Sequence, residues 1–105
     1  MKAEVLYIEG CPNHQLAVDN LRLVAEQQHC SVHIVQIEVH TAEEARQLAF
    51  LGSPSIRIDG IDIEPGARNA SAFGLGCRSY LTPEGRRGTP SIAMIREGLV
   101  EALNR

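Results

Sequence analysis

Gly10-Cys11-Pro12-Asn13-His14 separates a short apolar run, Val5-Leu6-Tyr7-Ile8, from a helical pattern that begins near Gln15. Cys11 is therefore expected at the point where a strand ends and a helix begins. The first turn of a helix has backbone N–H groups without partners, and the helix dipole is positive there. Both features favour a thiolate over a thiol, so this position predicts a nucleophilic cysteine.

Two neighbours of Cys11 fit the same interpretation. Pro12 suits the first turn of a helix, because it has no N–H to lose and its φ is already helical. His14 could reach back toward the helix end, and in its protonated form it would favour the thiolate further. The alternative is that Cys11 is only a small apolar residue packed after a strand.

Size and composition limit the classes of function. The chain has 105 residues, which is one ordinary domain, and 44% of them are hydrophobic. A net charge of -3 with mixed signs gives no indication of nucleic acid or of an anionic membrane surface as partner. The sequence has no membrane-spanning apolar run and no signal-peptide pattern, so we expect a reducing, cytoplasmic location. Three cysteines, an odd number, fit thiol chemistry better than a disulfide framework.

Hydrophobic patterning predicts the element order β-α-β-α-β-β-α. The expected strands cover 3–8, 31–39, 55–58 and 61–63, and the first helix covers 13–28. A second, short helix is expected to be capped by Thr41 and ended by Gly52. The last helix is expected to open with Thr89 as N-cap and Pro90 at its first position.

Three local signals complete the predicted topology. Strands on either side of a helix imply a parallel βαβ unit. Asp59-Gly60 between two alternating runs predicts an antiparallel hairpin. Ser53-Pro54 is a candidate cis peptide bond. Residues 64–88 have no clear period, and a loop of that length is usually functional or hides short structure of its own.

This order, with Cys11-Pro12 opening the first helix and Ser53-Pro54 opening the third strand, resembles the thioredoxin/glutaredoxin superfamily over nearly the whole chain apart from 64–88. Gly52–Ile56, Gly74–Arg78 and Tyr80 are similar to small bacterial thioredoxin-like proteins often encountered near mercury-resistance genes.

The resemblance implies a single α/β domain over residues 1–105 with a thioredoxin-like fold, in which a four-stranded mixed sheet has helices on both faces. It also implies that Pro54 is cis and lies against Cys11. The backbone of Ser53 would then be the place where a substrate pairs as an added strand.

One position departs from the pattern of the family. The familiar redox motif is Cys-x-x-Cys, and here His14 stands at its second cysteine. Three routes remain open. Cys11 could act alone and be resolved by glutathione, it could be resolved by Cys77, or it could bind a soft metal ion.

Cys77 decides between these routes. The flanking Gly76 gives backbone freedom, and Arg78 would favour a thiolate. The alternative is a small buried cysteine beneath a glycine-rich loop. Four arginines could meet an anionic partner such as the carboxylates of glutathione: Arg68, Arg78, Arg86 and Arg87.

The leading hypothesis is a thiol-disulfide oxidoreductase that acts on a protein or small-molecule disulfide or thiol, with no cofactor other than glutathione as a co-substrate. Its expected catalytic residues are Cys11, His14 and Cys77, and its expected substrate-binding residues are Pro12, Ser53, Pro54 and Arg78. The first alternative is a binder of Hg, Zn or Cu through Cys11, His14 and Cys77. The second alternative is a thioredoxin-fold interaction module without chemistry.

Overall fold

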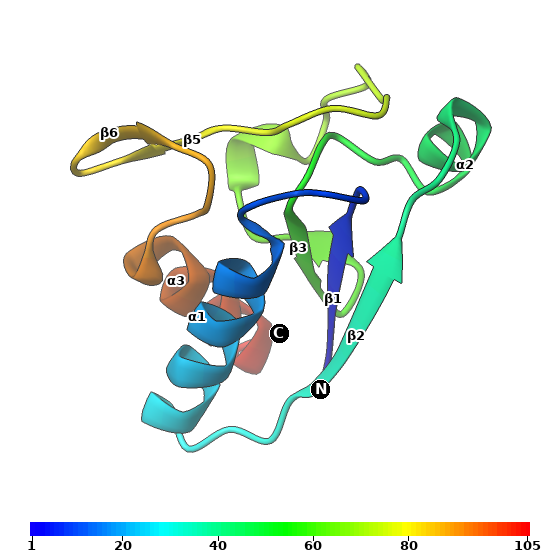
Figure 1. The fold of residues 1–105 in the computed structure, drawn as a ribbon. Helices are drawn as coiled ribbons and strands as arrows, with labels where there is room; N and C mark the ends of the chain where they lie inside the picture. Colours follow the sequence, from blue (N-terminus) through cyan, green and yellow to red (C-terminus); the bar gives the residue numbers. More distant parts are fainter.

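The computed structural model describes residues 1–105, and its centre is a four-stranded mixed sheet with the order β2-β1-β3-β4 (Figure 1). β1 pairs parallel with β2 and antiparallel with β3, and β3 pairs antiparallel with β4. These strands span Lys2–Tyr7 (β1), His33–Glu38 (β2), Ser55–Ile58 (β3) and Ile61–Asp62 (β4). The predicted βαβ unit and the hairpin are thus confirmed. Asp59 and Gly60 have φ values of 50° and 83°, as a two-residue hairpin turn requires.

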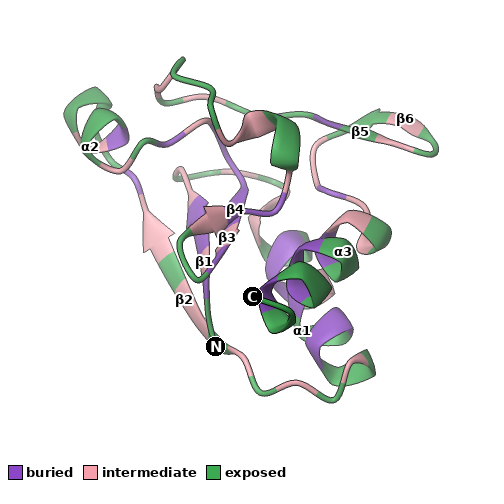
Figure 2. Cartoon of the chain, turned by 180° about the vertical axis from the view of Figure 1, so that it is seen from behind, coloured by how far each residue is buried: buried purple, intermediate pink, exposed green.

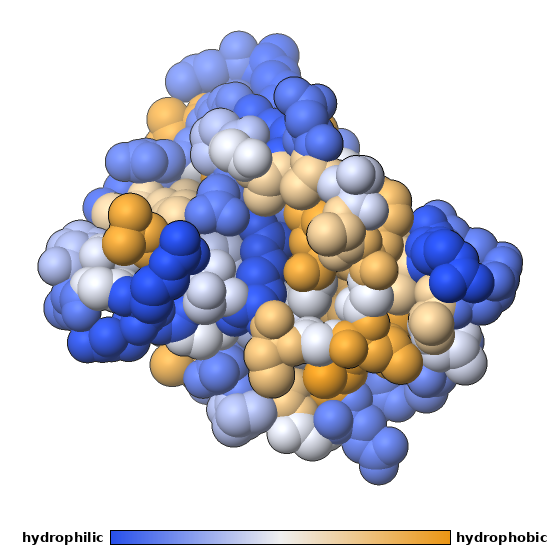
Figure 3. Space-filling model, turned by 90° about the horizontal axis from the view of Figure 1, so that it is seen from above, coloured by the Kyte–Doolittle hydropathy of each residue, from blue (hydrophilic) through white to orange (hydrophobic).

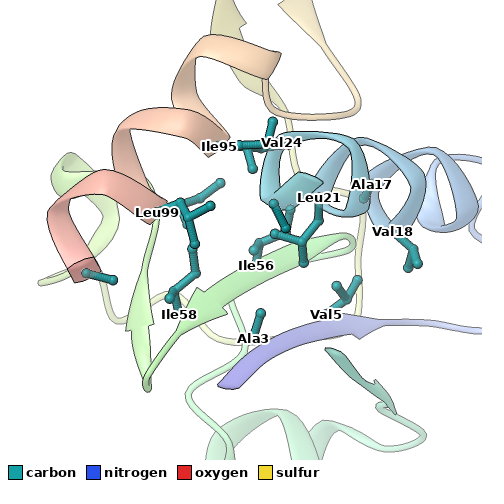
Figure 4. Close-up of a cluster of buried hydrophobic side chains, with 13 residues drawn as sticks. Ala3, Val5, Ala17, Val18, Leu21, Val24, Ile56, Ile58, Ile95 and Leu99 are labelled. Carbon is teal, nitrogen blue, oxygen red and sulfur yellow. The ribbon is translucent and has the colours of Figure 1, made fainter. Parts of the chain in front are cut away.

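The main core lies between the sheet and two helices, α1 (His14–Gln27) and α3 (Ile92–Leu103), which pack against each other on one face (Figures 1 and 2). Figure 4 shows strand side chains and helix side chains pointing toward one another across this layer (Figure 4). The labelled residues are Ala3, Val5, Ala17, Val18, Leu21, Val24, Ile56, Ile58, Ile95 and Leu99. Helical spacing in α1 and α3 and alternation in β1 and β3 put these apolar positions on facing surfaces.

A smaller cluster covers the opposite face of β1. Val5 and Leu6 are neighbours in the strand, so their side chains point to opposite faces. Leu6 packs with Val39, Phe50 and Ala45, the last of which belongs to helix α2 (Ala42–Gln47). The chain is therefore an α/β protein whose central strand is buried on both sides.

Three predicted helix boundaries are wrong by a few residues. α1 begins at His14 with Asn13 as N-cap, so Pro12 lies before the helix and not in its first turn. α2 ends at Gln47, and the left-handed residue after it is Ala49 (φ 53°) rather than Gly52. The N-cap of α3 is Ser91, whose hydroxyl accepts from the Met94 amide, and not Thr89. Local sequence signals locate helix ends only to within a residue or two, and the short α2 ends earlier than the glycine expected to stop it.

Residues 64–88 contain short structure of their own. A 3₁₀ helix, η1, spans Pro65–Ala67, and β5 (Tyr80–Thr82) and β6 (Gly85–Arg87) form a two-stranded hairpin. Ser53 and Cys77 form an isolated parallel bridge that ties this region to the sheet. None of the helices has the length and apolar character needed to cross a bilayer.

Candidate functional site

Cys11 lies in the tight connection between β1 and α1 and is half-buried. Its amide donates to the Ile8 carbonyl at 3.2 Å, and its own carbonyl accepts from the His14 amide at 3.5 Å. Asn13 makes no side-chain capping bond, and the first turn of α1 carries no acidic residue. No cap and no acidic residue of this first turn therefore competes for the positive end of α1, which is available to a thiolate at Cys11.

His14 is the first residue of α1, and its ring stacks on Tyr7 with centroids 3.6 Å apart and planes 7° from parallel. Its Nε2 atom is buried and has no hydrogen-bond partner. Buried ring nitrogens are usually paired. This one is an orphaned polar atom three residues after Cys11.

Ser53 connects the Cys11 loop to the start of β3. The Ser53-Pro54 peptide bond is cis, in agreement with the sequence-based expectation. The Ser53 hydroxyl accepts from the Ile8 amide at 3.1 Å, and the same Ile8 accepts from Cys11. One short hydrogen-bonded path thus links Cys11 to the residue before Pro54.

The backbone of Ser53 is already paired with another part of the chain. Its amide donates to the Gly76 carbonyl at 2.8 Å, and its carbonyl accepts from the Arg78 amide at 3.0 Å. These two bonds place Cys77 opposite Ser53. Cys77 is exposed, so it is not a small residue buried beneath the loop, and all three cysteines are free thiols.

Arg78 does not face solvent, and its guanidinium forms no contact with a thiol. The side chain is 6% exposed and lies 2.7 Å from the Asp62 carboxylate and 3.0 Å from that of Glu64. It also donates to the Ser55 hydroxyl at 3.1 Å. Burial, the largest single influence, acts to lower the pKa of Arg78, but the hydrogen bonds to Asp62 and Glu64 and the nearby negative charge together outweigh burial and leave the pKa raised. Arg78 is therefore a buried, charged side chain that forms ion pairs with both carboxylates.

Tyr80 contacts both Arg78 and Pro54. Its fully buried ring lies 4.5 Å from the Arg78 guanidinium carbon, and its hydroxyl donates to the Pro54 carbonyl at 2.5 Å. Burial raises the pKa of Tyr80 above its ordinary value. Ser53 and Pro54, the two residues of the cis peptide, are therefore both held by the segment from Gly76 to Tyr80.

We call this group the Arg78 cluster, defined as Arg78, Asp62, Glu64, Ser55 and Tyr80. The buried polar and charged residues of the whole protein are Ser53, Ser55, Asp62 and Arg78. Three of the four belong to the cluster and the fourth, Ser53, is bonded to it. Buried charges are retained only where they are paired. The buried polar and charged side chains of this protein therefore form one hydrogen-bonded group next to Pro54.

Sequence reasoning missed Asp62, Glu64 and Ser55 because their partner, Arg78, is distant along the chain. The alternation Ile61-Asp62-Ile63 carried a weak signal, since a carboxylate between two apolar residues of a short strand needs a cation nearby. The four arginines also separate into two groups. Arg68 donates to Glu101 at 3.0 Å and Arg78 is internal, whereas Arg86 and Arg87 are exposed on β6.

The face that contains the ends of β1 and β3 is partly apolar. Figure 3 looks down on it and shows apolar side chains gathered in the middle and right of the view, with hydrophilic margins around them (Figure 3). Partly exposed apolar residues in the segments that follow β1, α2 and η1 include Ile8, Leu48, Leu51, Phe73 and Leu75. Leu75, 45% exposed, directly precedes the segment paired with Ser53.

The structure groups the expected site residues in two sets. Cys11, Pro12 and His14 lie at the start of α1, and Cys77 and Arg78 lie in the segment that pairs with Ser53. No three His, Cys, Asp or Glu side chains are arranged so that they could hold a metal ion.

Fold and site together define a small α/β protein with a half-buried cysteine before an uncapped helix and a cis-proline segment beside it. Comparison with models of protein families, with curated proteins and with solved structures gives no significant match.

Proposed function

We propose that this chain is a thioredoxin-like thiol-disulfide oxidoreductase with Cys11 as its nucleophile. The observation that carries the proposal is the position of Cys11 before an α1 terminus that has no side-chain cap and no acidic residue. The positive helix end is therefore left to stabilise a thiolate. The hydrogen bonds from the Cys11 amide to Ile8 and from the Ile8 amide to Ser53 support the proposal, because they connect the backbone of the Cys11 loop to the residue before Pro54.

The proposed reaction has two exchange steps. The Cys11 thiolate attacks one sulfur of a substrate disulfide, a Cys11–substrate disulfide forms, and the other substrate sulfur leaves as a thiolate that takes a proton from water. A second thiolate then attacks the Cys11 sulfur and releases the remaining half of the substrate as a thiol. The substrate gains two electrons, and two thiols of the protein or its co-substrate lose them.

Cys77 is our candidate for the second thiol. It is exposed, and its backbone register places it beside Ser53, whose hydroxyl contacts the amide of Ile8 in the Cys11 loop. A small thiol such as glutathione would serve the same step without Cys77. Arg86 and Arg87 are the exposed members of the four arginines considered as contacts for its carboxylates. A reducing compartment such as the cytoplasm would supply that thiol.

The test is to add hydroxyethyl disulfide to the reduced protein and to locate the adducts by mass spectrometry over time. We expect a hydroxyethyl adduct on Cys11 that converts to a Cys11–Cys77 disulfide. In Cys77→Ser the adduct should accumulate, and in Cys11→Ser it should be absent from position 11. Cys30→Ser is the matched control and should behave as the wild type, because Cys30 follows the C-terminal end of α1, whereas Cys11 precedes the N-terminal end of the same helix. Adducts that form first on Cys30 or Cys77, with Cys11 unmodified, would overturn the proposal.

A further inference from the structure

The backbone edge at Ser53 is occupied by the protein's own chain. An extended peptide binds a sheet by pairing with a free N–H and C=O on an edge. At Ser53 both groups are used, by the Gly76 carbonyl at 2.8 Å and the Arg78 amide at 3.0 Å. A peptide substrate that approached Cys11 would find this edge already paired.

Ion pairs, hydrogen bonds and close packing fix the segment that occupies this edge, Gly76–Arg78. Arg78 is fixed by Asp62, Glu64 and Ser55, and Tyr80 is hydrogen-bonded to Pro54. Gly52 adds a steric constraint, since a Cβ built there would lie 3.0 Å from the Arg78 Cβ, and its φ of +126° also favours glycine. The paired state is therefore fixed by the Arg78 cluster as well as by two backbone hydrogen bonds.

The cavity that includes Ile8 and Glu9, just before Cys11 in the chain, is small. A cavity of about 200 Å³ is lined by Ile8, Glu9, Glu38, Val39, His40 and Leu75. Cavities that hold drug-sized ligands usually start at about 300 Å³. Ile8 is the residue hydrogen-bonded to Cys11, and Leu75 directly precedes the occupying segment, so the cavity lining includes one residue next to each of them.

We propose that Gly76–Arg78 acts as a built-in strand that excludes extended peptides from Ser53, so that the substrates of Cys11 are disulfides of low-molecular-weight thiols. This inference rests on the proposed oxidoreductase function. It adds a substrate class, and it assigns to the Arg78 cluster the role of setting that class. Residues of the cluster are positioning residues, since they act through the segment and do not touch the substrate.

The experiment compares two disulfides with the same leaving thiol. One is hydroxyethyl disulfide, and the other is a short extended peptide whose central cysteine is disulfide-bonded to mercaptoethanol. In the productive step Cys11 bonds to the hydroxyethyl sulfur or to the peptide sulfur, and mercaptoethanol thiolate leaves and is protonated by water. The measured quantity is the ratio of the rate constants for the Cys11–hydroxyethyl and Cys11–peptide adducts.

In the wild type we expect the small disulfide to react faster by about tenfold, because the peptide must first displace two backbone hydrogen bonds. In Arg78→Gln and in Tyr80→Phe the ratio of the two rate constants should fall toward one. Hydrogen exchange at the amides of Ser53 and Arg78 should accelerate in the same variants. Tyr80→Phe decides the matter if Arg78→Gln does not fold. Arg46→Gln is the matched control, because Arg46 pairs with Glu43 on the exposed surface of α2.

Three results would overturn the inference. A ratio near one in the wild type would show that the edge is not protected. A ratio unchanged in the released variants, with faster amide exchange, would show that the strand does not set the selectivity. If Cys11 reacts with neither disulfide, the proposed function fails and this inference fails with it, whereas equal reaction with both disulfides overturns this inference alone.

Discussion

Arg78 and Asp62 form the most buried ion pair of the protein, with 2.7 Å between Nη1 and Oδ2 and with side chains 6% and 9% exposed. The pair joins β4 to a segment that would otherwise be part of a long surface loop. That segment lies against Ser53 and Pro54, next to the loop that carries Cys11. The internal charges of the fold therefore maintain the arrangement of the candidate site.

Removal of one partner from this pair should be strongly destabilising. Arg78→Gln leaves the Asp62 carboxylate buried without its cation, and such losses cost about 3–5 kcal/mol. The free energy of unfolding from urea titration measures the effect. Arg46→Gln, which breaks an exposed pair, should change it by less than about 1 kcal/mol. Equal losses in the two variants would contradict the structural role of Arg78.

Gly98 should not tolerate alanine, although it lies within α3. Alanine would gain about 1 kcal/mol of helix propensity. Its Cβ, however, would lie 2.7 Å from Ile63 Cγ2 and 3.3 Å from the Ile63 Cα, and such overpacking costs about 1–3 kcal/mol. We expect a net loss in the free energy of unfolding. Gly74→Ala, where a Cβ meets nothing within 4 Å, is the control. A more stable Gly98→Ala would show that α3 shifts freely from Ile63.

Tyr80 should make stability fall at alkaline pH. Burial raises the pKa of Tyr80 in the folded state. Its stabilising contribution is therefore complete below the unfolded-state pKa of about 10, and it decreases as pH rises above that value, because only the unfolded chain releases the proton. Urea unfolding across this range should show a smaller alkaline loss in Tyr80→Phe than in the wild type. Parallel curves for the two proteins would contradict the assignment.

His14→Phe should separate the chemistry of His14 from its packing. Phenylalanine keeps an aromatic ring against Tyr7 and removes the buried Nε2 that has no partner. Relief of an unsatisfied polar atom should leave the protein as stable as the wild type or stabilise it by about 1 kcal/mol. If His14 assists the thiolate, alkylation of Cys11 at neutral pH should slow by about threefold to tenfold. An unchanged rate would reduce His14 to a packing residue.

Local sequence signals predicted the elements near the site well, because they depend on short-range chemistry. The apolar run before Cys11, the β-branched residues of β2 and Asp59-Gly60 each determine their own backbone, and the structure contains the strands and the turn they indicate. Ser53-Pro54 is cis as anticipated.

Contacts between residues far apart in the chain could not be predicted from local sequence signals. Arg78 appeared as a surface cation next to Cys77, because nothing in its neighbourhood reveals that Asp62 and Glu64 lie against it. The β5–β6 hairpin was also missed, although Pro83-Glu84-Gly85 between Thr82 and Arg86 was a readable turn signal. The role of Ser53 changed accordingly, from a free edge to one that the chain itself occupies.

An activated thiol at Cys11 should be visible in the relative alkylation rates of the three cysteines at neutral pH. Exposure alone predicts that Cys77 reacts first, because Cys77 is exposed while Cys11 and Cys30 are half-buried. We expect the opposite order, with Cys11 faster than Cys77 and Cys30 by about tenfold, because a thiolate at an uncapped helix terminus reacts faster than a thiol. Rates that follow exposure, with Cys77 first, would show that Cys11 is not activated.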